Sequence, residues 1–403
     1  MARLKWGMIG GGEGSQIGPV HRISSAMDGR FDLKAGALDA DSAKGRDFAL
    51  RLGIGADRAY GDWREMLAGE KDRRDRIDLV TVATPNATHH AITKAFLDAG
   101  IHVLCEKPMT VTVAEAEDIV ATSQRTGAIC AVNYGYSGYS LVRHMRAMIA
   151  RGDLGKLRLI VVEFSHGFHA DAADADNPRM RWRYDPAQAG ISGQFADCGI
   201  HALHLASFLS GQNAEELSAD FVSAIAGRKL EDDAMVNVRM DGGTTVRLWT
   251  SSVAIGSFHG FNIRVFGEKG GLRWAQQWPD QLQWTPLNGR TETIERGSGG
   301  LSPDAERATR IATGHSEGML VAFANIYADL ADVIEARANN AAPDPQALHF
   351  PTAVDGLRSI AAISAAVESA KAGGAWKDAR PPGLRGQSSL ISLTRGGHSG
   401  VGI

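Results

Sequence analysis

Two segments of the chain carry side chains that could bind an alcohol and accept its proton during oxidation. Lys107 follows a predicted strand, residues 102–105, and a lysine at the carboxyl end of a parallel strand points into the crevice where open α/β sheets bind ligands. Its ammonium can hold a hydroxyl and stabilise developing alkoxide charge. Asp197 and His201 would share one face of a helix, and a histidine can accept the hydroxyl proton. Taken singly, a surface salt bridge for the lysine and a helix-surface contact for the other pair are the plainer interpretations.

A glycine-rich segment, residues 9–21 (IGGGEGSQIGPVH), stands between the first apolar run and a stretch that can be helical. Glycine turns let the backbone approach a pyrophosphate, whose charge the amides and dipole of the helix N-terminus then meet. Ser15 stands where the third glycine of G-x-G-x-x-G would be, so we prefer a longer loop built on Gly10, Gly12 and Gly18. An ordinary tight turn is the alternative. The predicted cofactor contacts of the loop are Gly10, Gly12, Gly14, Ser15, Gln16 and Ile17.

An acidic residue follows the second predicted strand. Asp39 stands close to the position where a carboxylate accepts hydrogen bonds from the adenosine ribose hydroxyls and repels a 2′-phosphate. NAD is therefore the predicted cofactor. In the alternative interpretation Asp39 only caps the helix at Ser42, and the nearby Lys44 and Arg46 keep NADP open.

Up to residue 133, the predicted elements that must position these groups alternate between strands and helices. Strands alternating with helices of about ten residues predict βαβ units and a parallel sheet with helices on both faces. The predicted strands are 4–9, 31–38, 77–83, 102–105 and 128–133, and the predicted helices are 18–27, 42–52, 88–99 and 113–126.

Beyond residue 133 the predicted strands and helices no longer alternate. Glycine-containing turns at 241–243 and 256–260 join the last three predicted strands, which favours antiparallel neighbours. The predicted helices here are 140–151, 317–336 and 353–372, and the predicted strands are 156–165, 219–226, 234–240, 244–254 and 261–266. We predict an α/β protein with a Rossmann domain (1–133), an α+β domain with a large, mainly antiparallel open sheet for substrate binding and oligomerisation (134–380), and a C-terminal arm or tail (381–403).

Two further motifs, ATPNATH at 83–89 and CEKP at 105–108, complete a recognisable set. With the glycine loop they resemble the glucose-fructose oxidoreductase, inositol dehydrogenase and MocA family, in matching order from Leu4 to about His204. The resemblance is nearest to the scyllo-inositol and L-glucose oxidising branch, with levoglucosan dehydrogenases nearby. It implies a cis peptide bond before Pro108. It also implies that the cofactor cleft is lined by Thr84, Pro85, Asn86, His89, Glu106, Lys107 and Asn133.

The resemblance extends to the substrate side. The family pattern of an aspartate, three residues and a histidine matches Asp197 and His201, with the aspartate binding a neighbouring hydroxyl and favouring the imidazolium as it forms. Arg183 could donate a fork of hydrogen bonds to vicinal hydroxyls. The segment 314–318 is similar to a Gly-His-Pro-Glu-Gly element, although Ser316 replaces the proline. The predicted substrate contacts are Lys107, Tyr136, Trp182, Arg183, Asp197, His201 and His315.

Composition narrows the classes of function. Lysine and arginine total 43 against 46 for aspartate and glutamate, so no basic field favours nucleic acid or an anionic membrane. No apolar run of 18 residues occurs and no secretory signal is evident, so we expect a cytoplasmic protein. The cysteines fit neither a disulfide framework nor a paired zinc pattern, and we read them as reduced, buried thiols. They are Cys105, Cys130 and Cys198.

The resulting hypothesis is NAD-dependent oxidation of a secondary ring hydroxyl, in an inositol or a glucose-like pyranose, to a ketone or lactone. The alternative within the family is a levoglucosan or glycoside 3-dehydrogenase, and the alternative outside catalysis is a dinucleotide-sensing regulator. We predict no bound metal, but a zinc enzyme is a further alternative whose ligands would come from His166, His169, Asp197, His201 and His204. A homodimer or homotetramer is expected because one face of the second sheet has no obvious helical cover.

Overall fold

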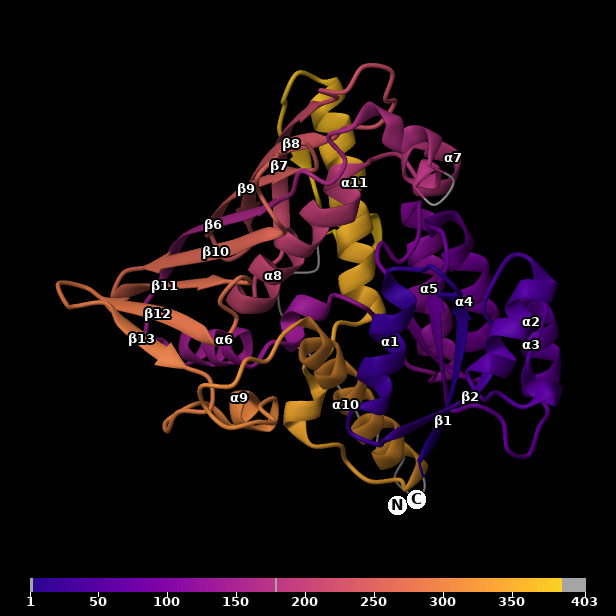
Figure 1. Cartoon of the computed structure of the whole chain (residues 1–403). Helices are drawn as coiled ribbons and strands as arrows, with labels where there is room; N and C mark the ends of the chain where they lie inside the picture. Colours follow the sequence, from indigo (N-terminus) through magenta and orange to yellow (C-terminus); the bar gives the residue numbers. More distant parts are fainter. Residues whose placement is uncertain (1–2, 178–179, 386–403) are drawn as a thin grey trace, which may run out of the picture.

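The computed structural model describes residues 3–177 and 180–385, which form two sheets with their helices (Figure 1). The first sheet has five parallel strands in the order β2-β1-β3-β4-β5. Its strands are β1 (Leu4–Gly10), β2 (Phe31–Ala37), β3 (Leu79–Ala83), β4 (His102–Cys105) and β5 (Cys130–Val132). Its helices are α1 (Ile17–Ala26), α2 (Ser42–Arg51), α3 (Trp63–Glu70), α4 (His89–Asp98) and α5 (Val113–Thr126). The predicted parallel sheet is confirmed, whereas α3 was not predicted.

This strand order places a switch point beside β1. The chain leaves β1 toward β2 on one side, while β3 pairs on the other side. Ligands of open α/β sheets bind in the crevice outside the carboxyl ends of the strands at such a point. The glycine loop after β1 and the segments after β3 and β4 therefore border one crevice.

Local sequence signals explain where the elements of the first sheet begin and end. Strand β3 has four buried residues in succession, as expected for a strand covered on both faces. Helix α5 starts at a capping box, in which Thr112 and Glu115 satisfy each other's backbone amides, and it ends at Gly127 with a left-handed φ of 71°. These are the helix bounds that the sequence predicted.

The second sheet has nine strands in the order β13-β12-β11-β10-β6-β9-β8-β7-β14. Helices α6, α8 and α11 cover one of its faces (Figure 1). Its strands are β6 (Leu157–Ser165), β7 (Ala214–Val222), β8 (Asp233–Met240), β9 (Thr245–Ser251), β10 (Gly260–Gly267), β11 (Gly270–Ala275), β12 (Gln281–Pro286), β13 (Glu292–Glu295) and β14 (Lys377–Asp378). The helices that follow β5 are α6 (Ser140–Arg151), α7 (Pro186–Ala189), α8 (Ile200–Ser210), α9 (Pro303–Arg307), α10 (Met319–Ala338) and α11 (Ala353–Lys371).

One predicted pairing is wrong. Strands β9 and β10 are not neighbours, because β6 lies between them, antiparallel to β10 and parallel to β9. The connection after β9 passes the end of β6, where His166 donates its amide to the Ser251 carbonyl and accepts the amide of Ala254. The glycine-containing segment between β9 and β10 thus crosses over the end of β6 instead of forming a hairpin between neighbouring strands. Strands β11, β12 and β13 were not predicted, and β7 begins five residues before its predicted start.

The long C-terminal helices return to the first sheet. Helix α10 packs beside α1 (Figure 1), and the ring of Tyr327 meets Trp6 of β1 edge to face with centroids 5.8 Å apart. Thr352 bridges to Ala131 of β5. The domain bounds at 133 and 380 remain a prediction, and most of the predicted tail, residues 386–403, lies outside the described part. None of the described helices combines the length and apolar character needed to cross a membrane.

Candidate active site

Lys107 and Asp197 meet between the two sheets. Lys107 follows β4, and its Nζ donates to Asp197 Oδ1 at 2.5 Å and to the Asp197 carbonyl at 2.8 Å. The other carboxylate oxygen of Asp197 accepts from Arg183 Nη1 at 2.6 Å. Burial would raise the pKa of Asp197, but Arg183 and Lys107 outweigh it, so the pKa lies well below its usual range. The carboxylate is therefore an ionised anchor between two cations.

His201 lies one turn beyond Asp197, in the first turn of α8. The residues just before it, Phe195–Gly199, form a π-helical turn that merges into α8. The ring of His201 is buried, and its Nδ1 has no hydrogen-bond partner. Burial and the charge of Lys107 hold its pKa well below the ordinary value, although Asp197 opposes them. At neutral pH the imidazole is thus uncharged and able to accept a proton.

Aromatic rings fix the orientation of His201. Tyr136 meets it edge to face at 5.0 Å between centroids, and Tyr134 does so at 5.7 Å. Tyr136 packs in turn against Phe261 of β10. The predicted substrate residue Tyr136 is therefore placed beside the predicted proton acceptor.

Glu106 is a second ionised carboxylate, on the cofactor side of Lys107. Its Oε1 lies 2.9 Å from His21 Nε2 of α1 and also accepts from the Asn133 side-chain amide. Burial would raise the pKa of Glu106, but His21, Lys107 and Asn133 together lower it. The Asn133 Oδ1 remains buried without a partner. Glu106 and Asn133 thus lie side by side at the crevice, and their contacts with the cofactor remain a prediction.

The glycine loop is shaped by close backbone contacts. A Cβ on Gly12 would lie 2.3 Å from the Leu38 carbonyl, and one on Gly18 would lie 2.0 Å from the Gly11 carbonyl. Gly18 therefore allows α1 to touch the turn, which is the role of the third glycine and supports the longer loop. Gln16 makes no side-chain cap at the start of α1, although Ser15 Oγ accepts the Gly18 amide at 3.1 Å.

Family models match both halves of the chain. Residues 4–134 match the oxidoreductase family with an NAD-binding Rossmann fold, and residues 142–273 match the GFO/IDH/MocA C-terminal domain. The uncharacterized oxidoreductase YfiI of Bacillus subtilis (strain 168) is 37% identical over 93% of this chain and 96% of its own length. This chain belongs to the Gfo/IDH/MocA family. The resemblance predicted from the sequence is thereby confirmed.

Solved structures extend this comparison. An inositol dehydrogenase homologue from Azotobacter vinelandii, complexed with NAD⁺, is 38% identical with a TM-score of 0.89 over 93% of this chain and 97% of that one. The same homologue was also solved with NADH and myo-inositol, at 37% identity and a TM-score of 0.86 over 93% and 97% of the two chains. The levoglucosan dehydrogenase of Pseudarthrobacter phenanthrenivorans is 25% identical over 70% of this chain and 76% of its own. This chain is an NAD-dependent dehydrogenase acting on CH–OH groups, and NAD is its cofactor.

The residues around the crevice fit NAD. The start of α1, where the Gln16 side chain makes no capping bond and Ser15 Oγ accepts the Gly18 amide, suits a diphosphate. Asp39 Oδ1 accepts the Asp41 amide, whereas its Oδ2 faces the glycine loop, 3.5 Å from where a Gly12 Cβ would be, and suits a ribose hydroxyl. The unpartnered Asn133 Oδ1 suits a carboxamide donor. The cofactor contacts of Asp39, Asn133 and the glycine loop remain predictions.

The three residues Thr84, Pro85 and Asn86, which follow β3, differ in their exposure and in their contacts. Thr84 lies against Gly10, where an added Cβ would be 2.8 Å from its methyl group. Pro85 is exposed, whereas Asn86 is buried and donates to the Ala189 carbonyl of α7 at 3.0 Å. Asn86 thus ties the cofactor side to the substrate side. His89 is buried beneath this segment and contacts carbonyls of Thr84 and Pro108, and the Lys107–Pro108 bond is cis, as the resemblance implied.

Two predicted substrate residues, Trp182 and Arg183, lie beside Asp197, but a third does not join them. Arg183 stacks over Trp182 at 4.7 Å, and its hydrogen bond to Asp197 leaves part of its fork for a ligand. His315 is exposed in the segment before α10, and its carbonyl accepts from Arg296 just beyond β13. Within residues 3–177 and 180–385, no hydrogen bond joins His315 to Lys107 or His201, so its substrate role remains a prediction.

The zinc alternative required ligands that the structure does not bring together. In residues 3–177 and 180–385, no three His, Cys, Asp or Glu side chains are arranged to hold a metal ion. His166 Nε2 instead lies 3.6 Å from the Cys198 sulfur, and His204 stacks on Tyr134 with centroids 4.1 Å apart. The three cysteines are free and buried, as predicted.

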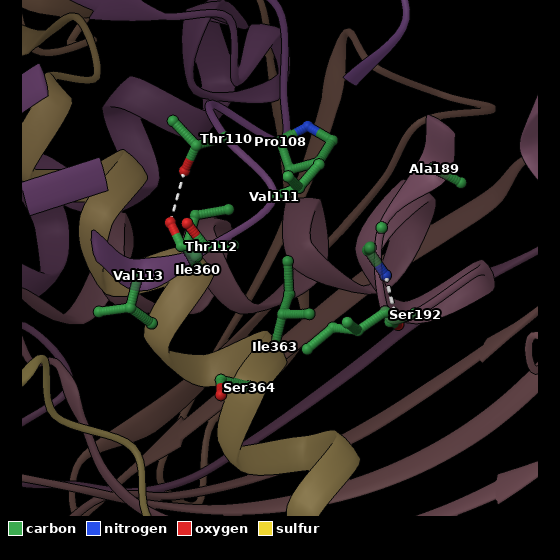
Figure 2. Close-up of a pocket in the computed structure, with 13 residues that line it drawn as sticks. Pro108, Thr110, Val111, Thr112, Val113, Ala189, Ser192, Ile360, Ile363 and Ser364 are labelled. Carbon is green, nitrogen blue, oxygen red and sulfur yellow. Dashed lines mark hydrogen bonds between the residues drawn. The ribbon is translucent and has the colours of Figure 1, made fainter. Parts of the chain in front are cut away.

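Two hollows flank this group. A cavity of about 230 Å³ is lined by residues 108–113, by Ser192 and by α11 (Figure 2). Its wall is mainly apolar, with Val111 and Ile363 among the side chains, so it lacks groups for proton transfer. A smaller hollow is lined by Asn86, Trp182, Arg183 and Asp197 and borders the chemistry directly.

Sequence reasoning missed His21 and the rings around His201. His21 connects Glu106 to Tyr327 of α10, whose hydroxyl lies 2.9 Å from His21 Nδ1. A signal was present, because His21 follows Gly18 by three residues and so shares the inward face of α1. Phe164 and Phe261 stack against each other beside His201, and no local pattern indicates that pairing across β6 and β10.

Proposed function

We propose that this dehydrogenase oxidises a secondary ring hydroxyl of a cyclic polyol or sugar to a ketone or lactone. Lys107 orients the hydroxyl, and His201 accepts its proton. The observation that carries the proposal is the unpartnered, uncharged imidazole of His201 beside the Lys107–Asp197 pair. A non-catalytic sensor of dinucleotide has no need of such a proton acceptor.

The residues divide the reaction between them. The Lys107 ammonium donates a hydrogen bond to the alcohol oxygen and stabilises negative charge as the O–H bond breaks. His201 takes the proton, and Asp197 stabilises the resulting imidazolium. Bound NAD supplies the acceptor for the hydride released as the C–H bond breaks and the C=O bond forms. One alcohol and one oxidised cofactor thus give one carbonyl compound, one NADH and one proton.

The substrate class is supported by two kinds of observation. Trp182 and Tyr136 offer apolar ring faces, and Arg183 and Asp197 offer charged hydrogen-bond partners, a combination that suits a polyhydroxylated ring. The homologue solved with myo-inositol supports an inositol, whereas the levoglucosan dehydrogenase supports an anhydro sugar or a glycoside oxidised at carbon 3. The inositol or glucose-like pyranose is the substrate we favour.

The test follows NADH absorbance with inositols, aldoses, levoglucosan and glycosides, in the wild-type protein and in Lys107→Met and His201→Asn. Each variant should retain NAD binding and lose about 100-fold or more of kcat/KM, the order of loss seen when a charge-stabilising donor or general base is removed. His204→Gln changes a buried neighbouring imidazole and is the matched control. No turnover of any ring alcohol, with NAD bound tightly, would favour the sensor instead.

A further inference from the structure

His89 is a buried histidine that the proposed reaction does not use. It is the first residue of α4, and only about 1% of its surface is exposed. Its Nδ1 lies 2.8 Å from the Pro108 carbonyl, and its Nε2 lies 2.8 Å from the Thr84 carbonyl. The ring therefore joins the segment after β3 to the segment after β4.

The two partners determine how many protons the ring holds. A carbonyl oxygen can only accept a hydrogen bond, so each ring nitrogen must donate. A neutral imidazole has one N–H, and its other nitrogen would direct a lone pair at a carbonyl oxygen. Only the imidazolium satisfies both contacts. We infer that His89 is a protonated clamp that holds the Lys107–Pro108 segment against the Thr84 segment, and so is a positioning residue for the catalytic lysine.

The electrostatic surroundings agree with this protonation state. Burial lowers the pKa of His89, but the Cys105 sulfur and the two carbonyls outweigh it and raise the pKa to about 9. Cys105 on β4 is the titratable side chain whose sulfur interacts with the ring. A cation at a helix N-terminus opposes the helix dipole, so these carbonyl contacts are needed to hold it.

Other charged groups near this element are directed elsewhere. On α4, His90 and Lys94 pair with Asp118 of α5. In the segment after β4, Glu106 pairs with His21, and Lys107 pairs with Asp197. The two loops consequently meet at His89 through carbonyl groups and not through a carboxylate.

The clamp has a defined direction with pH. Because the pKa is raised above its ordinary value of 6.5, the contribution of the clamp to stability is complete below about 6.5. It is lost as the pH rises through about 9. Loss of the second N–H would release one loop and leave Lys107 less well placed.

Nitrogen-15 spectra of histidine-labelled full-length protein test the protonation directly and need no substrate. At pH 7 both ring nitrogens of His89 should be protonated, and their signals should be missing in His89→Gln but present in His90→Gln. His90 is the matched control, since it adjoins His89 on α4 and pairs near the surface. His89→Asn identifies the same signals should His89→Gln fail to fold. A single protonated nitrogen at pH 7 would overturn the inference.

Kinetics test the positioning role, which rests on the proposed function. His89→Gln should lower kcat/KM by roughly 10-fold to 100-fold, as displacement of a catalytic group does, and should change the alkaline limb of its pH profile. His90→Gln should match the wild type in both. An unchanged profile and rate in His89→Gln would refute the positioning role, whereas absence of activity in every form, with the doubly protonated ring observed, would count against the proposed function alone.

Discussion

The cofactor side of the crevice is shaped mainly by backbone groups, whereas the substrate side is shaped mainly by charged side chains. On the cofactor side, glycines bring backbone into contact with backbone, as at Gly12 and Gly18, and the N-cap residue of α1, Gln16, makes no side-chain capping bond. On the substrate side, the shape depends on charged side chains, with Asp197 held between Lys107 and Arg183. A dinucleotide presents the same diphosphate to every enzyme, so fixed backbone suffices. A substrate hydroxyl must be held while its charge changes, which requires ionisable groups.

The histidines show the same contrast. His89, beneath the cofactor side, has a raised pKa and two carbonyl partners. His201, His166 and His204, on the substrate side, are buried in surroundings that lower their pKa. His89 thus holds a charged imidazole, whereas His201, His166 and His204 stay neutral until a proton is delivered.

The sharpest test of this contrast removes the charged anchor. Asp197→Ala leaves the Lys107 ammonium without its carboxylate partner, and kcat/KM should fall by about 1,000-fold, at the upper end of losses for a preorganised charge. Affinity for NAD, measured by fluorescence titration, should change little. Asp47→Ala, which removes a carboxylate from an exposed pair with Arg51, is the control. An equal loss of NAD affinity in Asp197→Ala would break the division between the two sides.

A substitution in the glycine loop should have a smaller effect than Asp197→Ala, and it should alter NAD binding instead of catalysis. In Gly12→Ala the new Cβ would meet the Leu38 carbonyl at 2.3 Å, so the loop must shift. KM for NAD should rise by up to about 100-fold, the order of loss that misplacement by about 1 Å causes, while kcat at saturating NAD changes little. Gly299→Ala adds the same atom where no heavy atom lies within 4 Å and should behave as wild type. A fall in kcat with unchanged KM would contradict this assignment.

The smallest effect concerns stability in acid. Burial lowers the pKa of His166 and His204 to about 4 each, so the unfolded chain binds protons that the folded one does not. Stability present above about pH 6.5 should decline as the pH falls toward about 4, by an order of 1 kcal/mol for each histidine. Urea unfolding at pH 7 and pH 5 measures this decline. His204→Gln should reduce the pH dependence, and an undiminished dependence would show that its ring is not the source.

The sequence predicted the first sheet better than the second. Strand β3 is a continuous buried run and α5 begins at a capping box, and such local signals determined the bounds of β4 and α5. The insertion of β6 between β9 and β10 depends on contacts between residues far apart in the chain, and no local pattern encodes it. For the same reason a glycine-containing connection was mistaken for a hairpin.

The candidate site shows a similar limit. Lys107, Asp197 and His201 could be identified from the sequence, because each lies in a motif that matches the family pattern. The Lys107–Asp197 contact joins residues 90 positions apart, and the sequence could predict only that both face the substrate. His21 was overlooked because its partners, Glu106 and Tyr327, come from two other elements.

The central position of β6 has a consequence for synthesis of the chain. Both of its pairing partners are made much later, since Leu159 pairs with Thr245 of β9, 86 residues on, and with Phe266 of β10, 107 residues on. A nascent chain that has reached residue 230 therefore carries an apolar strand with two bare edges. Such long-range pairing is slow, and unpaired edges invite association with other chains. Soluble yield should thus be more sensitive to changes in β6 than to equally buried changes in β4, whose partner β3 precedes it.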